Sequence, residues 1–317
     1  MLVDLDVVAG FRGARRAALA RYAFGGRLRG LDGIYVETSS FLPSEADIAF
    51  LGLARALKIP VLTYIRDAYQ LFEDYYRADT LRRWIGARAF LPAMRALGAV
   101  STHLAFPSLG LARAVVRDAS TAILLPPGSP APVEVGRNAA ARDLLFVGAG
   151  RLPAQGGDRL IAAVGLAREH GADVELIVVS RPGEEPLPPH PDWMRVVRAE
   201  GAAITALLPD VLATVIPRPR SPYNDLALPI KLFDYLAYGR PLIVTDCVEQ
   251  ARVVNDASAG IVTPDDVPAM ADAIGRLASA PADELDRWSS NAQAAARRAS
   301  WSARAASIVR ALASGDD

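Results

Sequence analysis

Lys231 and Asp234 are the two residues whose types and spacing point most directly to binding chemistry. They lie in LPIKLFDYLAYGRPLIVTD (228–246), three positions apart, so on a helix their side chains project side by side. We expect a helix over 229–238 with Pro229 at its first position, where the missing N–H costs nothing. The N–H groups and positive dipole at that end favour an anion. Lys231 could therefore bind a diphosphate, and Asp234 could accept hydrogen bonds from the paired hydroxyls of a ribose.

Lysine usage supports a specific role at position 231. Lys58 and Lys231 are the only lysines in a chain with thirty-three arginines. The alternative is that Lys231 and Asp234 form a surface ion pair, which contributes roughly a few tenths of a kcal/mol.

The same stretch resembles the donor-binding core of family-4-type retaining glycosyltransferases. Their pattern is a proline, a lysine, an acidic residue in a helix of the type E-Y-L/M-A-x-G, and then K/R-P-V-I. Here these places are taken by Pro229, Lys231, Asp234-Tyr235-Leu236-Ala237, Gly239 and Arg240-Pro241-Leu242-Ile243. The resemblance implies a GT-B fold, in which two Rossmann-like α/β domains face a cleft. It also implies phosphate binding near Lys231 and ribose binding by Asp234.

A second segment extends the resemblance towards the amino terminus. Phe146-Val147-Gly148, Arg151-Leu152 and QGGDRLI (155–161) are similar to the family's G-R-L…K-G-x-D-x-L-I. In the family the arginine and the lysine of this loop contact the donor diphosphate, which implies that role for Arg151, with Gln155 in the lysine's place. The alternative for Arg151 is a solvated loop arginine.

Three further donor-side predictions follow from the resemblance. VVRAEG (196–201) is similar to the strand and loop beside the nucleotide base, which makes Arg198 and Glu200 candidates. The family's second glutamate, eight residues before the helix acid, is Leu226 here. Either Asp225 substitutes through a shift of one residue, or backbone amides near 228–230, including Pro229 and Ile230, hold the sugar.

The acceptor side is expected in the first half of the chain. IPVLTYIRD (59–67) resembles a strand that ends in a His-Asp pair facing the cleft, with Arg66 where the histidine would be. Ligands of open α/β sheets collect at the carboxyl ends of strands. Asp67 is therefore a catalytic candidate that could orient an acceptor hydroxyl, and Arg66 could bind a phosphate. Alternatively, Asp67 caps the following turn.

Alternating β-branched runs and amphipathic stretches predict parallel sheets wound with helices. We expect an acceptor-side domain at 1–126, shortened because only about thirty residues precede its first strand, a proline-rich linker at 127–141, a nucleotide-sugar domain at 142–285 and helices at 286–317 that could pack back on the first domain. Strands are expected at 34–36, 61–65, 99–105, 123–125, 144–147, 174–179, 211–216, 242–245 and 261–262.

Composition argues against a membrane-spanning protein and against a structural metal site. No apolar run approaches the ~18 residues of a membrane-spanning helix. One cysteine, Cys247, and three scattered histidines exclude a structural zinc site, so we expect no metal. The acidic pairs Asp265-Asp266 and Asp316-Asp317 suit a helix start and a frayed tail. With no recognisable leader, the cytoplasm is the expected location.

Charge is unevenly divided along a chain whose formal net charge is zero. Residues 1–130 carry fifteen arginines and one lysine against eleven acids. The arginines gather at 11–29 and 81–97, interleaved with aromatic residues and leucines. Such stretches can lie on an anionic membrane surface, here the inner face. The alternative is an ordinary solvated helix face.

Together these features predict a metal-independent, retaining transferase that moves a hexose-type sugar from a UDP- or GDP-type donor to a hydroxyl of a glycan, a lipid or a small molecule, as in polysaccharide biosynthesis. The nucleotide sugar is a co-substrate, and no cofactor and no nucleic acid partner is expected. The alternative is a non-catalytic GT-B module that binds nucleotide or scaffolds a polysaccharide-assembly complex. Gln155, Leu226, Arg66 and the short first domain favour that alternative.

Overall fold

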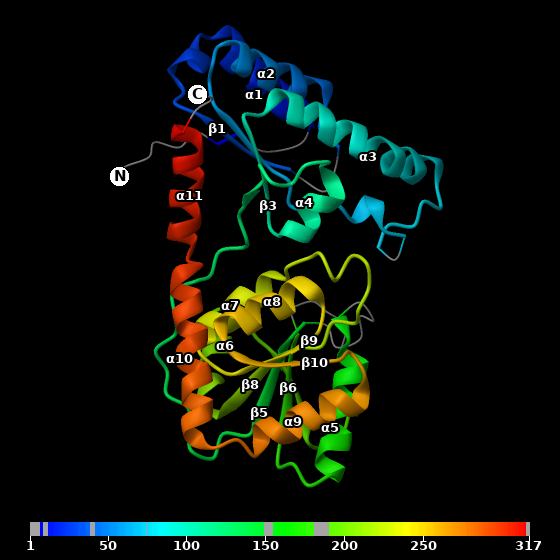
Figure 1. The fold of residues 1–317 in the computed structure, drawn as a ribbon, viewed down its shortest axis with the longest axis vertical. Coiled ribbons are helices and arrows are strands. Elements are labelled where there is room, and N and C mark those ends of the chain that lie inside the picture. Colours follow the sequence, from blue (N-terminus) through cyan, green and yellow to red (C-terminus); the bar gives the residue numbers. More distant parts are fainter. Residues whose placement is uncertain are drawn as a thin grey trace. The chain divides into compact units, whose positions relative to one another are not determined.

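The chain forms two compact units, each with a parallel sheet of its own (Figure 1). The computed structural model describes residues 7–8, 12–38, 42–73, 75–148, 155–180 and 190–314. The first unit takes in 1–126 and 305–317, and the second takes in 127–304. The α/β class with parallel sheets is as predicted.

The first unit is built on a sheet of order β1-β2-β3-β4 in which all neighbours are parallel. Its elements are α1 (Arg12–Phe24), η1 (Arg27–Gly30), β1 (Ile34–Glu37), α2 (Glu45–Ala56), β2 (Val61–Tyr64), η2 (Tyr69–Leu71), α3 (Leu81–Val100), β3 (His103–Phe106), α4 (Leu109–Val115), β4 (Ile123–Leu124) and the latter part of α11 (Trp301–Ala313).

Side chains alternate across β2 to build a core on each face of this sheet. Val61 and Ile65 join the cluster formed with α2 and α3, whereas Leu62 and Tyr64 pack with Ala311 of α11. A capping box starts α2, because the side chains of Ser44 and Asp47 each accept from the other's backbone N–H.

One predicted boundary in this unit is wrong. The arginine-rich stretch at 81–97 lies in a helix that continues to Val100, and the strand expected at 99–105 begins only at His103. Ser101 explains the break, because its hydroxyl donates to the carbonyl of Leu97 at 2.7 Å and lies 2.7 Å from the Thr63 hydroxyl of the neighbouring strand. The β-branched Val100 therefore ends a helix instead of starting a strand.

The second unit has a sheet of order β10-β9-β8-β5-β6-β7, again parallel throughout. Its elements are β5 (Asp143–Val147), α5 (Gly157–Glu169), β6 (Glu175–Ser180), β7 (Met194–Arg198), α6 (Ala202–Thr205), η4 (Leu208–Asp210), β8 (Val211–Ile216), α7 (Ile230–Tyr238), β9 (Leu242–Thr245), α8 (Val248–Ala257), β10 (Gly260–Thr263), α9 (Val267–Ala278), α10 (Ala282–Arg298) and the start of α11.

Strand order in this sheet reverses between β5 and β8. From β5 the chain adds β6 and β7 on one side, and it then returns to add β8, β9 and β10 on the other. In doubly wound sheets a ligand binds at such a switch point, beside the carboxyl ends of the two central strands. The topology alone therefore directs attention to the residues that follow Val147 and Ile216.

Helices cover both faces of this sheet (Figure 1). Leu144 and Phe146 of β5 point into the core that α5 and α9 cover, and Leu145 points into the opposite core with Ile204 and Leu208. α7 packs on that second side through Leu232, Phe233, Tyr235, Leu236 and Ala237, all of them buried. These contacts fix the apolar side of α7 against the sheet. Lys231 and Asp234 lie on the other side of the helix.

The proline-rich stretch expected as a linker is tied to the second unit at several points. The N–H groups of Ser129 and Val133 donate to the carbonyls of Ala299 and Ala237 at 2.8 Å each. Arg240 is buried. Its guanidinium makes five hydrogen-bond contacts with the carbonyl oxygens of Leu208, Gly239, Val135 and Gly136, two of them with Leu208. Burial, together with the nearby Arg137, lowers the pKa of Arg240 to about 10.

None of the helices in these described ranges has the length and hydropathy needed to cross a membrane.

Candidate donor-binding site

Lys231 reaches from α7 to the end of β5, at the switch point of the second sheet. Its Nζ donates to the Val147 carbonyl at 3.0 Å and to the Gln155 side-chain oxygen at 2.5 Å. The same ammonium lies 4.8 Å from the ring centroid of Phe146. Each of these partners is neutral. These contacts position the positive charge of Lys231 at the carboxyl end of the central strand.

Glycines at two places let the backbone close around this ammonium. A Cβ on Gly148 would lie 3.1 Å from the Gln155 oxygen and 3.2 Å from Lys231 Nζ. Gly156 has φ 72°, and a Cβ there would lie 1.7 Å from the Pro217 carbonyl oxygen. Only glycine permits this approach of the loop before α5 to the end of β8. The sequence resemblance marked this loop, but the contact with Pro217 is visible only in the structure.

The amino ends of α5 and α7 meet at the Lys231–Gln155 hydrogen bond. Gln155 directly precedes the N-cap of α5, Gly156, and Lys231 is the second residue of α7, whose N-cap is Pro229. Neither N-cap supplies a side-chain acceptor for the first-turn N–H groups. Two positive helix ends and one ammonium therefore gather at one place, which is an arrangement suited to a diphosphate.

Pro229 is the N-cap of α7 and not its first helical residue, which was the predicted position. Its φ of −71° and ψ of 133° are extended, so the helix begins at Ile230. The side chain of Ile230 is 60% exposed. Any contact of these two residues with a donor would therefore come from backbone groups of the first turn.

Tyr235 is hydrogen-bonded to the same end of β5, and the sequence predicted no role for it. It is fully buried, and its hydroxyl oxygen accepts from the Val147 N–H at 2.7 Å. Burial raises the pKa of this phenol well above its ordinary value. Val147 is thus bound by α7 through both of its backbone groups, to Tyr235 and to Lys231. The motif contains a sequence signal for this contact. Its tyrosine follows the acidic residue on the helix, and a tyrosine that is buried there needs a hydrogen-bond partner for its hydroxyl.

Asp234 lies one turn further along α7 on the stripe of Lys231. Its carboxylate is half-buried and makes no hydrogen bond or ion pair within the described parts of the chain. Burial alone raises the pKa of Asp234. The predicted ion pair between Lys231 and Asp234, the alternative to a binding role, is therefore not formed. Asp234 remains available to accept hydrogen bonds from a ligand.

Asp225 is placed differently from the other donor candidates, because Arg220 already binds it. Arg220 Nε and Nη2 donate to its two oxygens at 2.6 and 2.8 Å, and Nη1 donates to Asp246 at 3.2 Å. The Arg220 N–H also donates to Asp265 at 2.6 Å. These bonds organise the loop between β8 and α7, and they neutralise the charge that was expected to replace the missing glutamate at Leu226.

The remaining donor-side predictions fall at or beyond the edge of this cluster. Arg198 and Glu200 are exposed at the end of β7, which is the edge strand and is separated from β5 by β6. Arg151 lies outside the described residues. Within the described residues no group of three or more histidine, cysteine, aspartate or glutamate side chains is placed to hold a metal ion.

Comparison with known proteins matches part of the second unit to a family model. Residues 141–280 match the model of the family Glycosyl transferases group 1. Over these residues the second unit is similar to group 1 glycosyltransferases. The match spans the whole cluster described above, from the end of β5 through α7. A search of curated proteins found no match.

Solved structures similar to the whole chain share its architecture at low identity. The UDP-forming α,α-trehalose-phosphate synthase from Burkholderia xenovorans has a TM-score of 0.62 at 13% identity, over 96% of this chain and 80% of that one. Sucrose-phosphate synthase from Thermosynechococcus elongatus has a TM-score of 0.58 at 16% identity, over 95% and 79%. TarM has a TM-score of 0.56 at 10% identity, over 84% and 58%. These similarities confirm the predicted GT-B class.

Outside the second unit, Arg66 and Asp67 follow β2 of the first unit. Arg66 Nε donates to Asp67 at 3.0 Å, and its Nη1 lies 3.6 Å from a Glu37 oxygen. The hydrogen bond from Arg66 to Asp67 and the two negative charges raise the pKa of Arg66. The predicted pair is therefore brought together at the carboxyl end of a strand, with its charges largely satisfied by each other and by Glu37.

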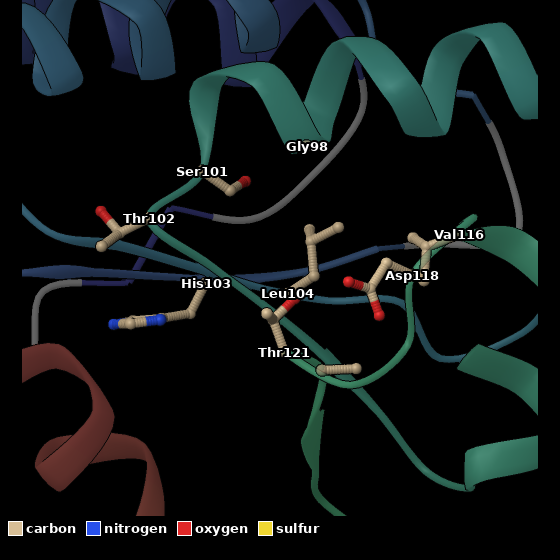
Figure 2. A pocket seen from close by; sticks show the side chains of 9 residues that line it. Gly98, Ser101, Thr102, His103, Leu104, Val116, Asp118 and Thr121 are labelled. Atoms are coloured by element: carbon tan, nitrogen blue, oxygen red, sulfur yellow. The ribbon is translucent and has the colours of Figure 1, made fainter. Parts of the chain in front are cut away.

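A hollow of about 220 Å³ also lies in the first unit, lined by Ser101, Thr102, His103, Asp118 and Thr121 among others (Figure 2). It sits at the amino ends of β3 and β4, away from the strand ends where ligands of parallel sheets bind. The imidazole of His103 points away from Asp118 and Thr121 in Figure 2. We assign no ligand to this hollow.

Proposed function

We propose that the chain transfers a sugar from a nucleoside-diphosphate sugar to a hydroxyl acceptor with retention of configuration. The observation that carries the proposal is the meeting of Lys231 with two uncapped helix ends at the switch point of the second sheet. A diphosphate carries the negative charge that this arrangement would compensate. The family match on residues 141–280 supports the same class of reaction.

Lys231 and the helix ends would act on the departing diphosphate. As the bond between the anomeric carbon and the phosphate oxygen breaks, its electron pair moves to that oxygen, where Lys231 and the first-turn N–H groups stabilise the growing charge. The acceptor oxygen bonds to the anomeric carbon on the same face, and its proton passes to the leaving phosphate. No pair of catalytic carboxylates is then required.

Asp234 would hold the ribose of the donor. Its carboxylate is half-buried and unpaired, and two neighbouring hydroxyl groups can donate to its two oxygens. A ligand hydrogen bond would offset the burial that raises its pKa. Pro229, Ile230 and Asp225 would then line the sugar side, with Arg220 fixing Asp225, and Arg198 would lie towards the base.

A second candidate function is a nucleotide-binding module without transfer activity. Two observations favour it. Gln155 stands where the resembling family has a second cation, and Arg66 is paired with Glu37 and Asp67 where that family has a histidine. Both changes leave donor binding possible through Lys231 and reduce the groups available for the transfer step.

Isothermal titration of UDP and GDP, followed by incubation with UDP- and GDP-sugars, tests both functions. A transferase binds one of the nucleotides and slowly hydrolyses the matching sugar donor even without an acceptor. Binding without any release of sugar would support the second candidate. If neither nucleotide binds, the donor site is wrongly assigned and both functions are overturned.

A further inference from the structure

The outward face of α3 in the first unit exposes large apolar side chains. Leu81 is 74% exposed, Trp84 is 49% exposed and Ile85 is 50% exposed. They lie at the amino end of the helix, which extends beyond β1 to β3 of its own unit (Figure 1). Exposed apolar residues gathered at one place usually mark an interaction surface.

Helical spacing places these residues on the side opposite the core. Trp84 and Ile85 lie three and four positions after Leu81, and Arg88 lies four and three positions after them, so the four residues form one stripe. Phe90, Met94 and Leu97 are buried and form the other side of α3 against the sheet. The apolar stripe is therefore additional to the residues that stabilise the fold.

Positive charge surrounds the stripe. α3 carries four arginines and no acidic residue. Arg83 forms a hydrogen-bonded pair with Asp79, but Arg82, Arg88 and Arg95 are exposed and form no ion pair within the described ranges. The Arg88 guanidinium lies 5.3 Å from the Trp84 ring centroid.

The other arginine-rich stretch of the first unit is partly engaged within the protein. Arg15 forms a bidentate pair with Asp47 of α2 at 2.9 and 2.8 Å, and Arg16 binds Glu45 at 2.8 Å. These two arginines thus hold α1 against α2. Arg21, Arg27 and Arg29 of the same stretch are exposed, so α3 is distinguished from it by three large exposed apolar side chains on one helix face rather than by its arginines alone.

We propose that the outward face of α3, formed by Leu81, Trp84, Ile85 and the flanking Arg82 and Arg88, docks on an anionic membrane surface. An indole with an adjacent guanidinium suits the headgroup region, and unpaired arginines suit negatively charged lipids. A second copy of the chain fits less well, because a twofold contact would bring the same arginines together. A lipid surface supplies apolar depth and negative charge at once.

Sedimentation with vesicles tests the proposal without any donor or acceptor. At low salt the protein should bind vesicles of equal parts phosphatidylcholine and phosphatidylglycerol and should not bind phosphatidylcholine alone. Arg82→Gln with Arg88→Gln should lower the partition coefficient about 25-fold, because each arginine near such a surface contributes about fivefold. Leu81→Gln, Trp84→Gln and Ile85→Gln together should abolish binding.

Arg27→Gln with Arg29→Gln is the matched control, since both residues are exposed in η1 and the charge change is the same. This control should lower binding less than threefold. Brominated lipid should quench wild-type fluorescence and fail to quench Trp84→Phe. Thermal melts of all variants check that the fold is intact.

Three results would overturn the proposal. The first is no binding of the wild type to anionic vesicles. The second is an equal loss in the Arg27 and Arg29 control, which would indicate general attraction. The third is a dimer in light scattering that disappears with the triple apolar variant, which would assign the face to a second copy.

Discussion

Lys231 in the second unit and Arg66 in the first are both cations at the carboxyl end of a parallel strand, and they differ in what holds them. Lys231 is held by a carbonyl, an amide oxygen and an aromatic ring. Arg66 is held by the carboxylates of Asp67 and Glu37. The three neutral groups orient the ammonium of Lys231 without opposing its charge, whereas the two carboxylates beside Arg66 offset most of the charge of the guanidinium.

The surroundings of the two cations differ in the same way. The site in the second unit combines a positioned charge, two helix ends and an acid that has no partner among the described residues. The first unit offers a compact ion network that stabilises its own loop. Donor binding can therefore be argued from geometry, while the role of Arg66 and Asp67 towards an acceptor stays a prediction.

Removal of Lys231 and removal of Arg66 should have very different effects on nucleotide binding. Lys231→Ala should weaken UDP or GDP binding about a hundredfold, because charge-assisted hydrogen bonds to the phosphates are lost. Arg66→Ala should leave nucleotide binding within about twofold, since its charge is already neutralised. Isothermal titration of both variants measures the contrast. Equal effects would show that partner charge does not decide the binding role.

The loop that supplies the neutral partner of Lys231 should be intolerant of a side chain. Gly156→Ala places a Cβ against the Pro217 carbonyl at a left-handed φ and should lower the free energy of unfolding by about 2 kcal/mol. Gly171→Ala is the control. Gly171 has φ 96° with nothing within 4 Å, so only the backbone strain of about 1 kcal/mol applies. Urea denaturation compares the two, and equal losses would argue against the close approach at Pro217.

Asp234→Asn should change nucleotide affinity and thermal stability in opposite directions. Nucleotide affinity should fall about tenfold, because the amide replaces one of the two accepting oxygens with a donor NH2 group and removes the charge that strengthens these hydrogen bonds. Since burial raises the folded-state pKa of Asp234, ionising it destabilises the fold at neutral pH, and the asparagine variant should melt at a higher temperature. That gain should disappear as pH falls through the raised pKa, where wild-type Asp234 becomes protonated. A lower melting temperature at neutral pH would contradict the prediction.

A change of the side chain that binds Lys231 should have a smaller effect on nucleotide binding. Gln155→Glu gives Lys231 a carboxylate partner of the same shape, so that it resembles Arg66. Nucleotide affinity should fall about fivefold as that carboxylate competes with the phosphates. Gln155→Met is the control, because it keeps the volume without adding charge and should change affinity less. Tighter binding in the glutamate variant would refute the idea that neutral partners preserve the charge.

Much of the fold followed from local pattern because short buried strands and capped helices are locally encoded. The strands around Leu144, Val211 and Leu242 lie within one residue of the predicted ranges. The error at Val100 arose because a β-branched residue next to a strand resembles one in it, and the hydroxyl of Ser101 decided the boundary through contacts distant in sequence.

The sequence predicted only those parts of the site whose binding side chains lie on a single element. Lys231 and Asp234 share a helix, so spacing was enough to place them on one stripe. The Gln155 oxygen at Lys231, the Tyr235 hydroxyl at Val147 and the Arg220 pair that occupies Asp225 each join segments that meet only in the folded sheet. No local pattern encodes a partner that is 76 residues away along the chain.

The buried guanidinium of Arg240 also has a consequence for local opening. Since it binds the carbonyls of Val135 and Gly136, and Ser129 and Val133 are bonded to Ala299 and Ala237, the proline-rich connection cannot detach without breaking part of the core around α7. Its amides should therefore exchange with deuterium at rates close to those of α7, and a protease should cut it slowly. The proline-rich composition suggests a flexible linker, but these contacts predict that the stretch opens slowly.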